Sequence, residues 1–252
     1  MSQEQLLDQS AKWYNSSDGF KKDWGDFHKH LMRYRFKTIE NWLRGESCIE
    51  FGTADGESTK FLFNYFKNVV AVEGAEHFYK QVRKRFSEYL DSRRFEVHWS
   101  MFEDFQPDDR YNVVLALHVL EHLAEPVAFL KRVKNFLKEN GVLIVMVPNA
   151  QSIHRLVAVK MGLLEAPHSL NPQDIQLGHT RVYYPQELFN DIYRSGLQII
   201  EQGGILFKPL TNKQLQNFCD IQIIDGFYEL GKDFAEYAAE IYAVCQLPRS
   251  QS

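Results

Sequence analysis

The chain has 252 residues, of which 44% are hydrophobic and 14% aromatic, and its formal net charge is −4. These values indicate a packed globular core, and they provide no positive field that would hold nucleic acid. Three cysteines, Cys48, Cys219 and Cys245, lie far apart and form no zinc or disulfide pattern, which favours a reducing compartment. Because the N-terminus lacks an apolar signal segment and no long apolar run follows, we expect a cytoplasmic protein without a membrane partner.

The first segment is polar but carries several aromatic rings. Its rings are Trp13, Tyr14, Phe20, Trp24 and Phe27. Two interpretations are open: a helical lid over a ligand opening, or an aromatic stripe that packs on the domain. In the first, Trp13, Tyr14 and Trp24 are candidate substrate-binding residues. A helix from about His28 to Arg44 follows, so residues 1–44 are expected to form a lid and a lead-in helix.

A strand, a Gly-rich turn and a helix follow one another in residues 48–59, which read Cys-Ile-Glu-Phe-Gly-Thr-Ala-Asp-Gly-Glu-Ser-Thr. This succession is the usual entry of a nucleotide-type ligand into a doubly wound sheet. A dinucleotide site would need glycine where Ala54 stands, and the pattern is instead E-x-G-x-x-x-G from Glu50 through Gly52 to Gly56. A carboxylate at Glu50 would repel a phosphate but would suit an ammonium or sulfonium group.

The second strand, residues 69–72, ends at Glu73, 21 residues beyond Gly52. At this spacing an acidic side chain takes the hydroxyls of a ribose. A ligand with a ribose, a cationic head and no phosphate is S-adenosylmethionine. The stretch resembles motif I of the class I S-adenosylmethionine-dependent methyltransferases, and the resemblance extends from about Trp24 to the C-terminus. The alternative, a glycine turn without a ligand, is disfavoured by Glu50 and Glu73 together.

The resemblance implies a set of cofactor-binding residues along the ends of the strands. The expected contacts are Glu50, Gly52, Thr53, Ala54 and Gly56 to the methionine part, Glu73 and Gly74 to the ribose, Met101, Phe102 and Glu103 to the adenine, and Leu117 and His118 to the methionine end. Met101 and Phe102 also suit an adenine by their apolar faces. The alternative is that Phe102 belongs to the core and the nearby acids are solvated.

Alternating strands and helices predict an α/β fold with a doubly wound, seven-stranded, mostly parallel sheet whose last strand is antiparallel. Further strands are expected at residues 95–99, 111–117, 142–147, 197–201 and 238–246, and helices at 76–90, 126–138, 153–164 and 185–195. The methyltransferase core would span residues 45–252. Insertions on the ligand side are expected at about 150–180, which is largely loop after its first helix, and at 205–236, which is mostly helical.

The stretch His118-x-x-Glu121-His122 matches a zinc-protease pattern. Because His118 ends a strand and Pro126 begins the next helix, we do not expect both histidines on one helix, and we assign no metal ligand. Glu121-His122 also resembles the E-H pair of the ubiquinone-pathway O-methyltransferases, where it orients a loop, a substrate or a metal ion. A metal-dependent hydrolase using His118, Glu121 and His122 therefore stays open as an alternative.

Methyl transfer needs an acceptor held in line with the methyl group and, for some acceptors, a base. His179 is the first candidate because residues 178–181 lie in a segment expected to close over the site, and His122 is the second. A histidine that is only solvated, and catalysis by proximity alone, are the alternatives.

These features predict methyl transfer from S-adenosylmethionine to an oxygen or nitrogen of a small molecule, with carbon ranked below them, in secondary metabolism or cofactor synthesis. Nucleic-acid amino methyltransferases carry a [DNS]-P-P-[YF] turn where residues 117–120 read Leu-His-Val-Leu, so nucleic acid is disfavoured. The alternative from another class is a ligand-binding protein that kept the fold and lost turnover. The sequence leaves the oligomeric state and the acceptor open.

Overall fold

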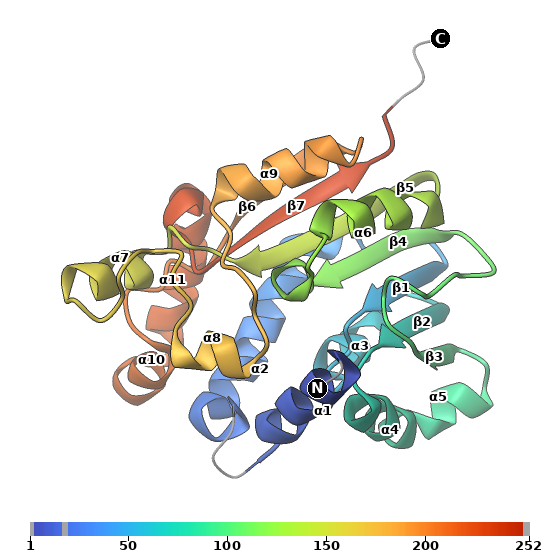
Figure 1. Ribbon diagram of the computed structural model, residues 1–252, viewed down its shortest axis with the longest axis horizontal. Helices are drawn as coiled ribbons and strands as arrows, with labels where there is room; N and C mark the ends of the chain where they lie inside the picture. Colours follow the sequence, from blue (N-terminus) through green and yellow to red (C-terminus); the bar gives the residue numbers. More distant parts are fainter. Residues whose placement is uncertain (1–2, 17–19, 249–252) are drawn as a thin grey trace.

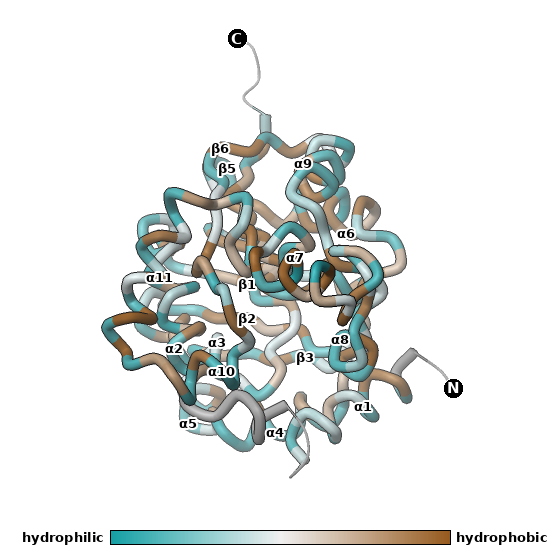
Figure 2. The backbone as a smooth tube through the Cα atoms, turned by 90° about the vertical axis from the view of Figure 1, so that its left-hand side faces the viewer, coloured by the Kyte–Doolittle hydropathy of each residue, from teal (hydrophilic) through white to brown (hydrophobic). Residues whose placement is uncertain are grey.

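The computed structural model describes residues 3–16 and 20–248, and the side chains of residues 5–16 and 27–248. A seven-stranded sheet lies between layers of helices (Figure 1). The strands are β1 (Ser47–Phe51), β2 (Asn68–Glu73), β3 (Phe95–Trp99), β4 (Tyr111–Leu117), β5 (Leu137–Pro148), β6 (Gln198–Ile205) and β7 (Glu240–Gln246). Their apolar residues lie inside the molecule, as the hydropathy colouring in Figure 2 shows.

The strand order is β3-β2-β1-β4-β5-β7-β6, and β7 runs antiparallel to both of its neighbours while the other pairs are parallel. This confirms the predicted sheet. The register pairs Ser47 with Asn68 and Phe51 with Val72, so β1 and β2 end level with each other. The residues that follow both strands therefore lie side by side at one edge of the sheet.

Alternation along the strands produces two cores, one on each face of the sheet. In β4, Val113 and Leu115 pack into one core, while Val114 and Ala116 pack into the other. The first core is covered by α2 (Phe20–Ile39), α3 (Glu57–Leu62), α4 (Glu76–Arg85) and α11 (Ile221–Asp233), and the second by α6 (Pro126–Val133) and α9 (Pro185–Arg194). Both faces are thus buried, as a doubly wound sheet requires.

Two predicted helices end earlier than their periodicity suggests. The helix expected over 76–90 is divided at Phe86 into α4 and α5 (Ser87–Asp91). Phe86 leaves helical geometry, and its ring packs against Gly56, where a side chain on the glycine would come within 2.7 Å of the ring. The helix expected over 126–138 ends at Val133, and one 3₁₀ turn leads directly into β5.

The two predicted insertions bring helices to the carboxyl end of the parallel strands. Figure 1 shows α7 (Ile153–Lys160), α8 (Pro172–Gln176) and α10 (Asn212–Phe218) on the side toward which β4 and β5 point. The loop expected over 165–180 contains the short helix α8. Asn171 and Asp174 form a capping box around Pro172 at its first turn, which fixes this helix locally.

The N-terminal segment forms α1 (Gln3–Tyr14) and α2, which begins at Phe20 rather than near residue 28. Helix α1 packs on α4, where Ala11 and Tyr14 are buried with Ala75 and Phe78. Within the described ranges, none of the helices combines the length and apolar character that crossing a bilayer requires.

Candidate active site

A cavity of about 520 Å³ lies at the carboxyl ends of β1 to β5, which is a volume typical of small-ligand sites. The strand order reverses between β1 and β4, and ligands of doubly wound sheets bind at this switch point. We call the wall formed by the last residue of β2 and the residues that follow β1, β2 and β3 the loop end; it comprises Gly52, Thr53, Ala54, Glu73, Gly74, Met101, Phe102 and Glu103. We call the wall formed by α2, the insertions and the start of β7 the insertion end; it comprises Arg35, His154, Arg155, Asp174, Lys208, Asn212 and Glu240.

Glu73 is the charged residue that the main chain of the loop end holds in place. Its carboxylate accepts hydrogen bonds from the Ala75 amide at 2.8 Å, the Ala54 amide at 3.0 Å and the Thr53 hydroxyl at 3.2 Å. Burial raises the pKa of Glu73, and these donors oppose that shift. The result is a carboxylate that is fixed in direction and still lines the cavity, as recognition of ribose hydroxyls requires.

The turn after β1 brings the main chain close to the cavity. Gly52 has φ +75°, and a Cβ there would lie 3.3 Å from the Val119 side chain and 3.7 Å from the Phe102 ring. Ala54 adopts φ +45°, a left-handed conformation that costs a residue with a side chain about 1–2 kcal/mol. Gly74 approaches the Leu7 side chain of α1 in the same way, since a Cβ on this glycine would lie 3.0 Å from it. The tight turn leaves little room beside these glycines.

Glu50 lies beneath this turn and outside the cavity lining. It is only 1% exposed, and its two carboxylate oxygens accept hydrogen bonds from the hydroxyls of Ser58 and Thr59 in α3. Burial raises the pKa of Glu50 to about 7, and the Glu73 carboxylate adds to the shift. This placement corrects the expected direct contact with the methionine part: Glu50 joins β1 to α3. Gly56 also lies away from the cavity.

His118 links two buried acids at the end of β4. Its Nδ1 lies 3.1 Å from Glu121 Oε1, and its Nε2 lies 3.4 Å from Glu240 Oε2. Burial and the Arg35 charge oppose protonation, but the two carboxylates outweigh them and raise the pKa of His118. The residue has φ +58°, a strained conformation of the kind found at binding sites. His118 lines the cavity, as expected.

Arg35 and Glu240 form a buried ion pair behind His118. The guanidinium of Arg35 donates to Glu240 through Nη2 at 2.5 Å and Nε at 2.8 Å. Burial disfavours the Glu240 carboxylate, but Arg35 and His118 lower its pKa far below the ordinary value. The carboxylate is therefore ionised and satisfied.

His122 and His179 come together across the cavity wall, with ring centroids 4.8 Å apart. The Nδ1 of His122 lies 3.3 Å from the Gly178 carbonyl oxygen, and burial lowers the pKa of His122 to about 4. Because a carbonyl only accepts, this nitrogen carries the proton of a neutral ring, and Nε2 is left as an acceptor.

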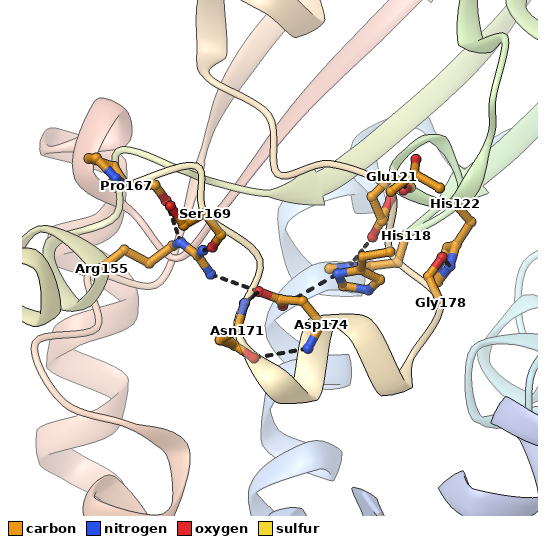
Figure 3. Close-up of polar contacts among 11 residues, drawn as sticks. His118, Glu121, His122, Arg155, Pro167, Ser169, Asn171, Asp174 and Gly178 are labelled. Carbon is orange, nitrogen blue, oxygen red and sulfur yellow. Dashed lines mark hydrogen bonds and ion pairs between the residues drawn. The ribbon is translucent and has the colours of Figure 1, made fainter. Parts of the chain in front are cut away.

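Asp174 on α8 joins His179 to the insertion end. Its Oδ1 lies 3.4 Å from His179 Nδ1, and its Oδ2 lies 3.3 Å from Arg155 Nη1. Arg155 also donates to the carbonyls of Pro167 and Ser169. Figure 3 shows Asp174 between Arg155 and His118. Burial opposes ionisation of Asp174, but His179, the Asn171 amide and Arg155 lower its pKa. Asp174 is therefore a carboxylate next to His179.

One group of side chains has the geometry of a metal site. Single ligand atoms of Glu121, His122 and His179 all lie within 4.8 Å of one another. His118 faces Glu121 and Glu240 instead, and the 3₁₀ turn Leu120–His122 begins after it, so the two histidines do not share a helix, as the sequence indicated. The protease pattern is thus not present in three dimensions.

Most predicted site residues line the cavity. Those that do are Gly52, Thr53, Ala54, Glu73, Gly74, Met101, Phe102, Glu103, Leu117, His118, His122, His179 and Tyr14. Trp13 packs beside the α1 cluster, and the side chain of Trp24 lies outside the described residues. Phe102 combines both interpretations, since it lines the cavity and packs edge-on against Phe51 of the core.

The charged residues of the insertion end could not be predicted from the sequence. Arg35, Arg155 and Lys208 come from α2, α7 and the segment after β6, so no local spacing connects them. The capping pattern of Asn171 and Asp174 was the signal that could have indicated an ordered segment there.

The fold and cavity define a Rossmann-like protein with a nucleoside-sized site at its strand ends. The chain belongs to the methyltransferase domain family, whose profile matches residues 24–202. S-adenosylmethionine is the cofactor of this methyltransferase family. The family prediction and the cofactor prediction are thereby confirmed.

Curated relatives match only part of the chain. A ubiquinone biosynthesis O-methyltransferase of Rhodopseudomonas palustris (strain HaA2) is 27% identical over 114 residues, which are 44% of this chain and 43% of the relative. The enzyme of the same name from Rickettsia felis is 26% identical over 145 residues, or 56% of each chain. The chain thus spans about half the length of the curated relatives it matches.

Solved structures match almost the whole chain in fold. The CcbJ methyltransferase of Streptomyces caelestis has a TM-score of 0.65 and 14% identity, and covers 99% of this chain and 100% of its own. The N-methyltransferase NodS of Bradyrhizobium japonicum WM9, solved with S-adenosylhomocysteine, has a TM-score of 0.62 and 9% identity, covering 97% and 99%. The [4+2]-cyclase SpnF, with a TM-score of 0.60 and 12% identity over 98% and 92%, shows that the fold also supports other reactions.

Proposed function

We propose that the chain transfers a methyl group from S-adenosylmethionine to an oxygen or nitrogen atom of a small molecule. The observation that carries the proposal is Glu73, held at the end of β2 beside the Gly52 turn and facing a cavity of nucleoside size. The cofactor supplies a methyl group already activated by a sulfonium. The protein then has to bind and orient the methyl acceptor and to exclude water from the site.

The loop end has the groups that such a cofactor needs. Glu73 would accept hydrogen bonds from the ribose hydroxyls, and Met101 and Phe102 would contact the adenine. Leu117 and His118 would line the methionine end. Helix α1 lines this side of the cavity through Tyr14, so we assign residues 1–44 as a helical lid and lead-in helix, and residues 45–252, with their two insertions, as the core.

His179 is our candidate base for the acceptor. Asp174 lies behind its Nδ1, an arrangement that holds an imidazole in one orientation and stabilises it when it gains a proton. His122 presents a neutral Nε2 close to the same ring and is the second candidate. Both would act on a proton of the acceptor, while the cavity positions the accepting atom.

The relatives support both kinds of acceptor atom. The curated ones are named O-methyltransferases of ubiquinone biosynthesis, which favours oxygen and a role in cofactor synthesis. NodS and the glycopeptide methyltransferase MtfA are named N-methyltransferases, and MtfA matches with a TM-score of 0.56 at 15% identity. Secondary metabolism is the other setting that we propose.

The direct test is release of S-adenosylhomocysteine from S-adenosylmethionine in the presence of a panel of small phenols and amines. We expect acceptor-dependent release by the wild-type chain, and strongly reduced release by Glu73→Ala. Tight binding of S-adenosylhomocysteine without transfer to any acceptor would favour the ligand-binding alternative. Stoichiometric zinc together with metal-dependent ester or amide hydrolysis would favour a hydrolase that uses Glu121, His122 and His179.

A further inference from the structure

His154 lies in the first turn of α7 and lines the cavity at the insertion end. Its Nδ1 is buried and has no hydrogen-bond partner among the residues that the structure describes. Burial, together with the charges of Lys208 and Arg155, holds the pKa of His154 well below its ordinary value, so the ring is neutral. Buried polar atoms in native proteins nearly always have a partner, and an unpartnered one in a cavity wall indicates that a ligand provides it.

Two other histidines of the cavity wall lie beside acids, and His154 does not. His118 Nε2 lies 3.4 Å from Glu240 Oε2, and His179 Nδ1 lies 3.4 Å from Asp174 Oδ1. The charges that act on His154 are cationic, and they oppose its protonation. Because its pKa is far from neutral pH, His154 is suited to hydrogen bonding as an uncharged ring rather than to proton transfer.

The charged groups of the insertion end are engaged with one another. Arg35 donates twice to Glu240, and Arg155 donates to Asp174 at 3.3 Å. Burial lowers the pKa of Lys208 to about 8, and the same two carboxylates act against that shift, so they stabilise its ammonium as well. A charged ligand group would have to compete with these counter-ions, whereas an uncharged polar group would leave them in place.

A second uncharged group belongs to the same insertion. Gln173, in the first turn of α8, is half-buried and lines the cavity. A neutral imidazole and a carboxamide each present both donors and acceptors. A hydroxyl group also donates and accepts, so it can pair with either nitrogen state of His154 and with the amide of Gln173.

We propose that the insertion end holds an uncharged hydroxyl group of the methyl acceptor through His154 Nδ1. This hydroxyl is distinct from the oxygen or nitrogen atom that is methylated. The inference rests on the proposed methyl transfer, and it narrows the acceptor to a small molecule with a second, distal hydroxyl group instead of a charged group or an apolar tail. His154 is a positioning residue in this scheme.

Calorimetric titrations of the protein saturated with S-adenosylhomocysteine test the subsite. The probes are three pairs of phenols in which a hydroxyl group replaces a methyl group at increasing reach. The pairs are hydroquinone with para-cresol, para-(hydroxymethyl)phenol with para-ethylphenol, and para-(hydroxyethyl)phenol with para-propylphenol. In at least one pair we expect the hydroxyl member to bind about threefold to tenfold more tightly, because a hydrogen bond to an otherwise unpaired buried group contributes that much.

An anionic probe separates a hydroxyl site from an anion site. Its carboxylate replaces the hydroxymethyl group in para-hydroxybenzoate. We expect this anion to bind no more tightly than para-(hydroxymethyl)phenol, because the cations of the insertion end already have carboxylate partners.

Three histidine variants assign the effect to His154. His154→Phe keeps a ring without nitrogens and should lose the preference for the hydroxyl probes, while His154→Asn keeps a polar atom near the position of Nδ1 and should retain part of it. His168→Phe, in the same insertion but outside the cavity, should change nothing. Affinity for S-adenosylhomocysteine should be unchanged in all three.

Stability distinguishes binding from a merely structural role. Because His154→Phe removes a buried nitrogen that has no partner, its midpoint of urea unfolding should equal or exceed that of the wild-type chain. A lower midpoint together with an unchanged hydroxyl preference would show that His154 only supports the fold.

Equal or weaker binding of the hydroxyl member in all three pairs would overturn the subsite, and so would a preference of wild-type size in His154→Phe. Tighter binding of para-hydroxybenzoate would overturn the assignment to an uncharged group. If His154→Phe loses S-adenosylhomocysteine binding through misfolding, His154→Leu decides by the same criterion. Lack of S-adenosylhomocysteine binding by the wild-type chain would instead contradict the proposed methyl transfer, and the phenol titrations then report on the subsite alone.

Discussion

The two ends of the cavity are built in different ways. The loop end consists of turns that directly follow β1, β2 and β3, and the main-chain amides of Ala54 and Ala75 fix its carboxylate. The insertion end consists of side chains that four distant segments bring together, held by ion pairs such as Arg35 with Glu240. The geometry of the loop end thus depends on the local backbone, while that of the insertion end depends on tertiary charge pairing.

The largest effect should come from breaking the charge pairing. Arg35→Met leaves Glu240 buried without its guanidinium and should lower the free energy of unfolding by about 3–5 kcal/mol in urea titrations. Arg33→Met is the matched control, because Arg33 lies on the same helix but pairs with Asp225 at the exposed surface. The Arg33→Met variant should lose less than about 1 kcal/mol of unfolding free energy. Equal losses of unfolding free energy in the two variants would show that the pair of Arg35 and Glu240 does not stabilise the insertion end.

Glu50, which lies beneath the loop end, should make the free energy of unfolding depend on pH. Its pKa rises from 4.5 to about 7 on folding, so its contribution to stability is complete below pH 4.5 and is lost as pH rises toward 7. The loss should be at most about 3 kcal/mol. The Glu50→Gln variant should not show this loss of stability between pH 4.5 and 7.

The measurement for Glu50 is the difference between the two unfolding free energies across this range. That comparison is needed because His122, whose pKa falls from 6.5 to about 4, acts in the opposite direction within the same range. Parallel curves for wild-type protein and Glu50→Gln would contradict the assignment of Glu50 as a buried support of the turn.

His179→Ala should lower turnover about a hundredfold with an identified acceptor, at the low end of the range for a positioned base. S-adenosylhomocysteine affinity should stay unchanged, because His179 is held by Asp174 on the opposite side from the loop end. His168→Ala is the control, since His168 lies near Tyr184 outside the cavity. Unchanged turnover in His179→Ala would remove it as the base.

Glu73→Ala should weaken S-adenosylhomocysteine binding by about 1–3 kcal/mol, which is the usual cost of leaving hydrogen-bonding groups without partners. Calorimetry measures this change, with Glu88→Ala on the exposed side of α5 as the control. If Glu73→Ala bound with wild-type affinity, the ribose assignment would fail, and with it the contrast between the two ends.

Sequence reasoning predicted the loop end because its geometry follows from neighbouring residues. The glycine after β1 and the acid at the end of β2 come level through strand pairing, so their spacing along the chain was enough to place Gly52 and Glu73 together. The direction of Glu50 could not be placed in this way. It depends on the hydroxyls of Ser58 and Thr59 folding back from α3, which strand spacing does not specify.

The insertion end depends on contacts between residues that are far apart in the sequence. Arg35 and Glu240 are 205 positions apart, and Lys208 follows β6 without any motif around it. Such residues look like ordinary surface charges until tertiary packing buries them. The missed helix α8 is different, since its capping residues Asn171 and Asp174 were a readable local signal.

A calorimetric comparison of S-adenosylhomocysteine with NADH on the wild-type chain tests the cofactor assignment of the loop end. The turn has Ala54 where a dinucleotide site needs glycine, and the Glu73 carboxylate lines the cavity where it could accept hydrogen bonds from a ribose. We predict saturable, equimolar binding of S-adenosylhomocysteine and no binding of NADH. Binding of NADH, or no heat with S-adenosylhomocysteine, would contradict the assignment of the loop end to a phosphate-free adenosyl cofactor.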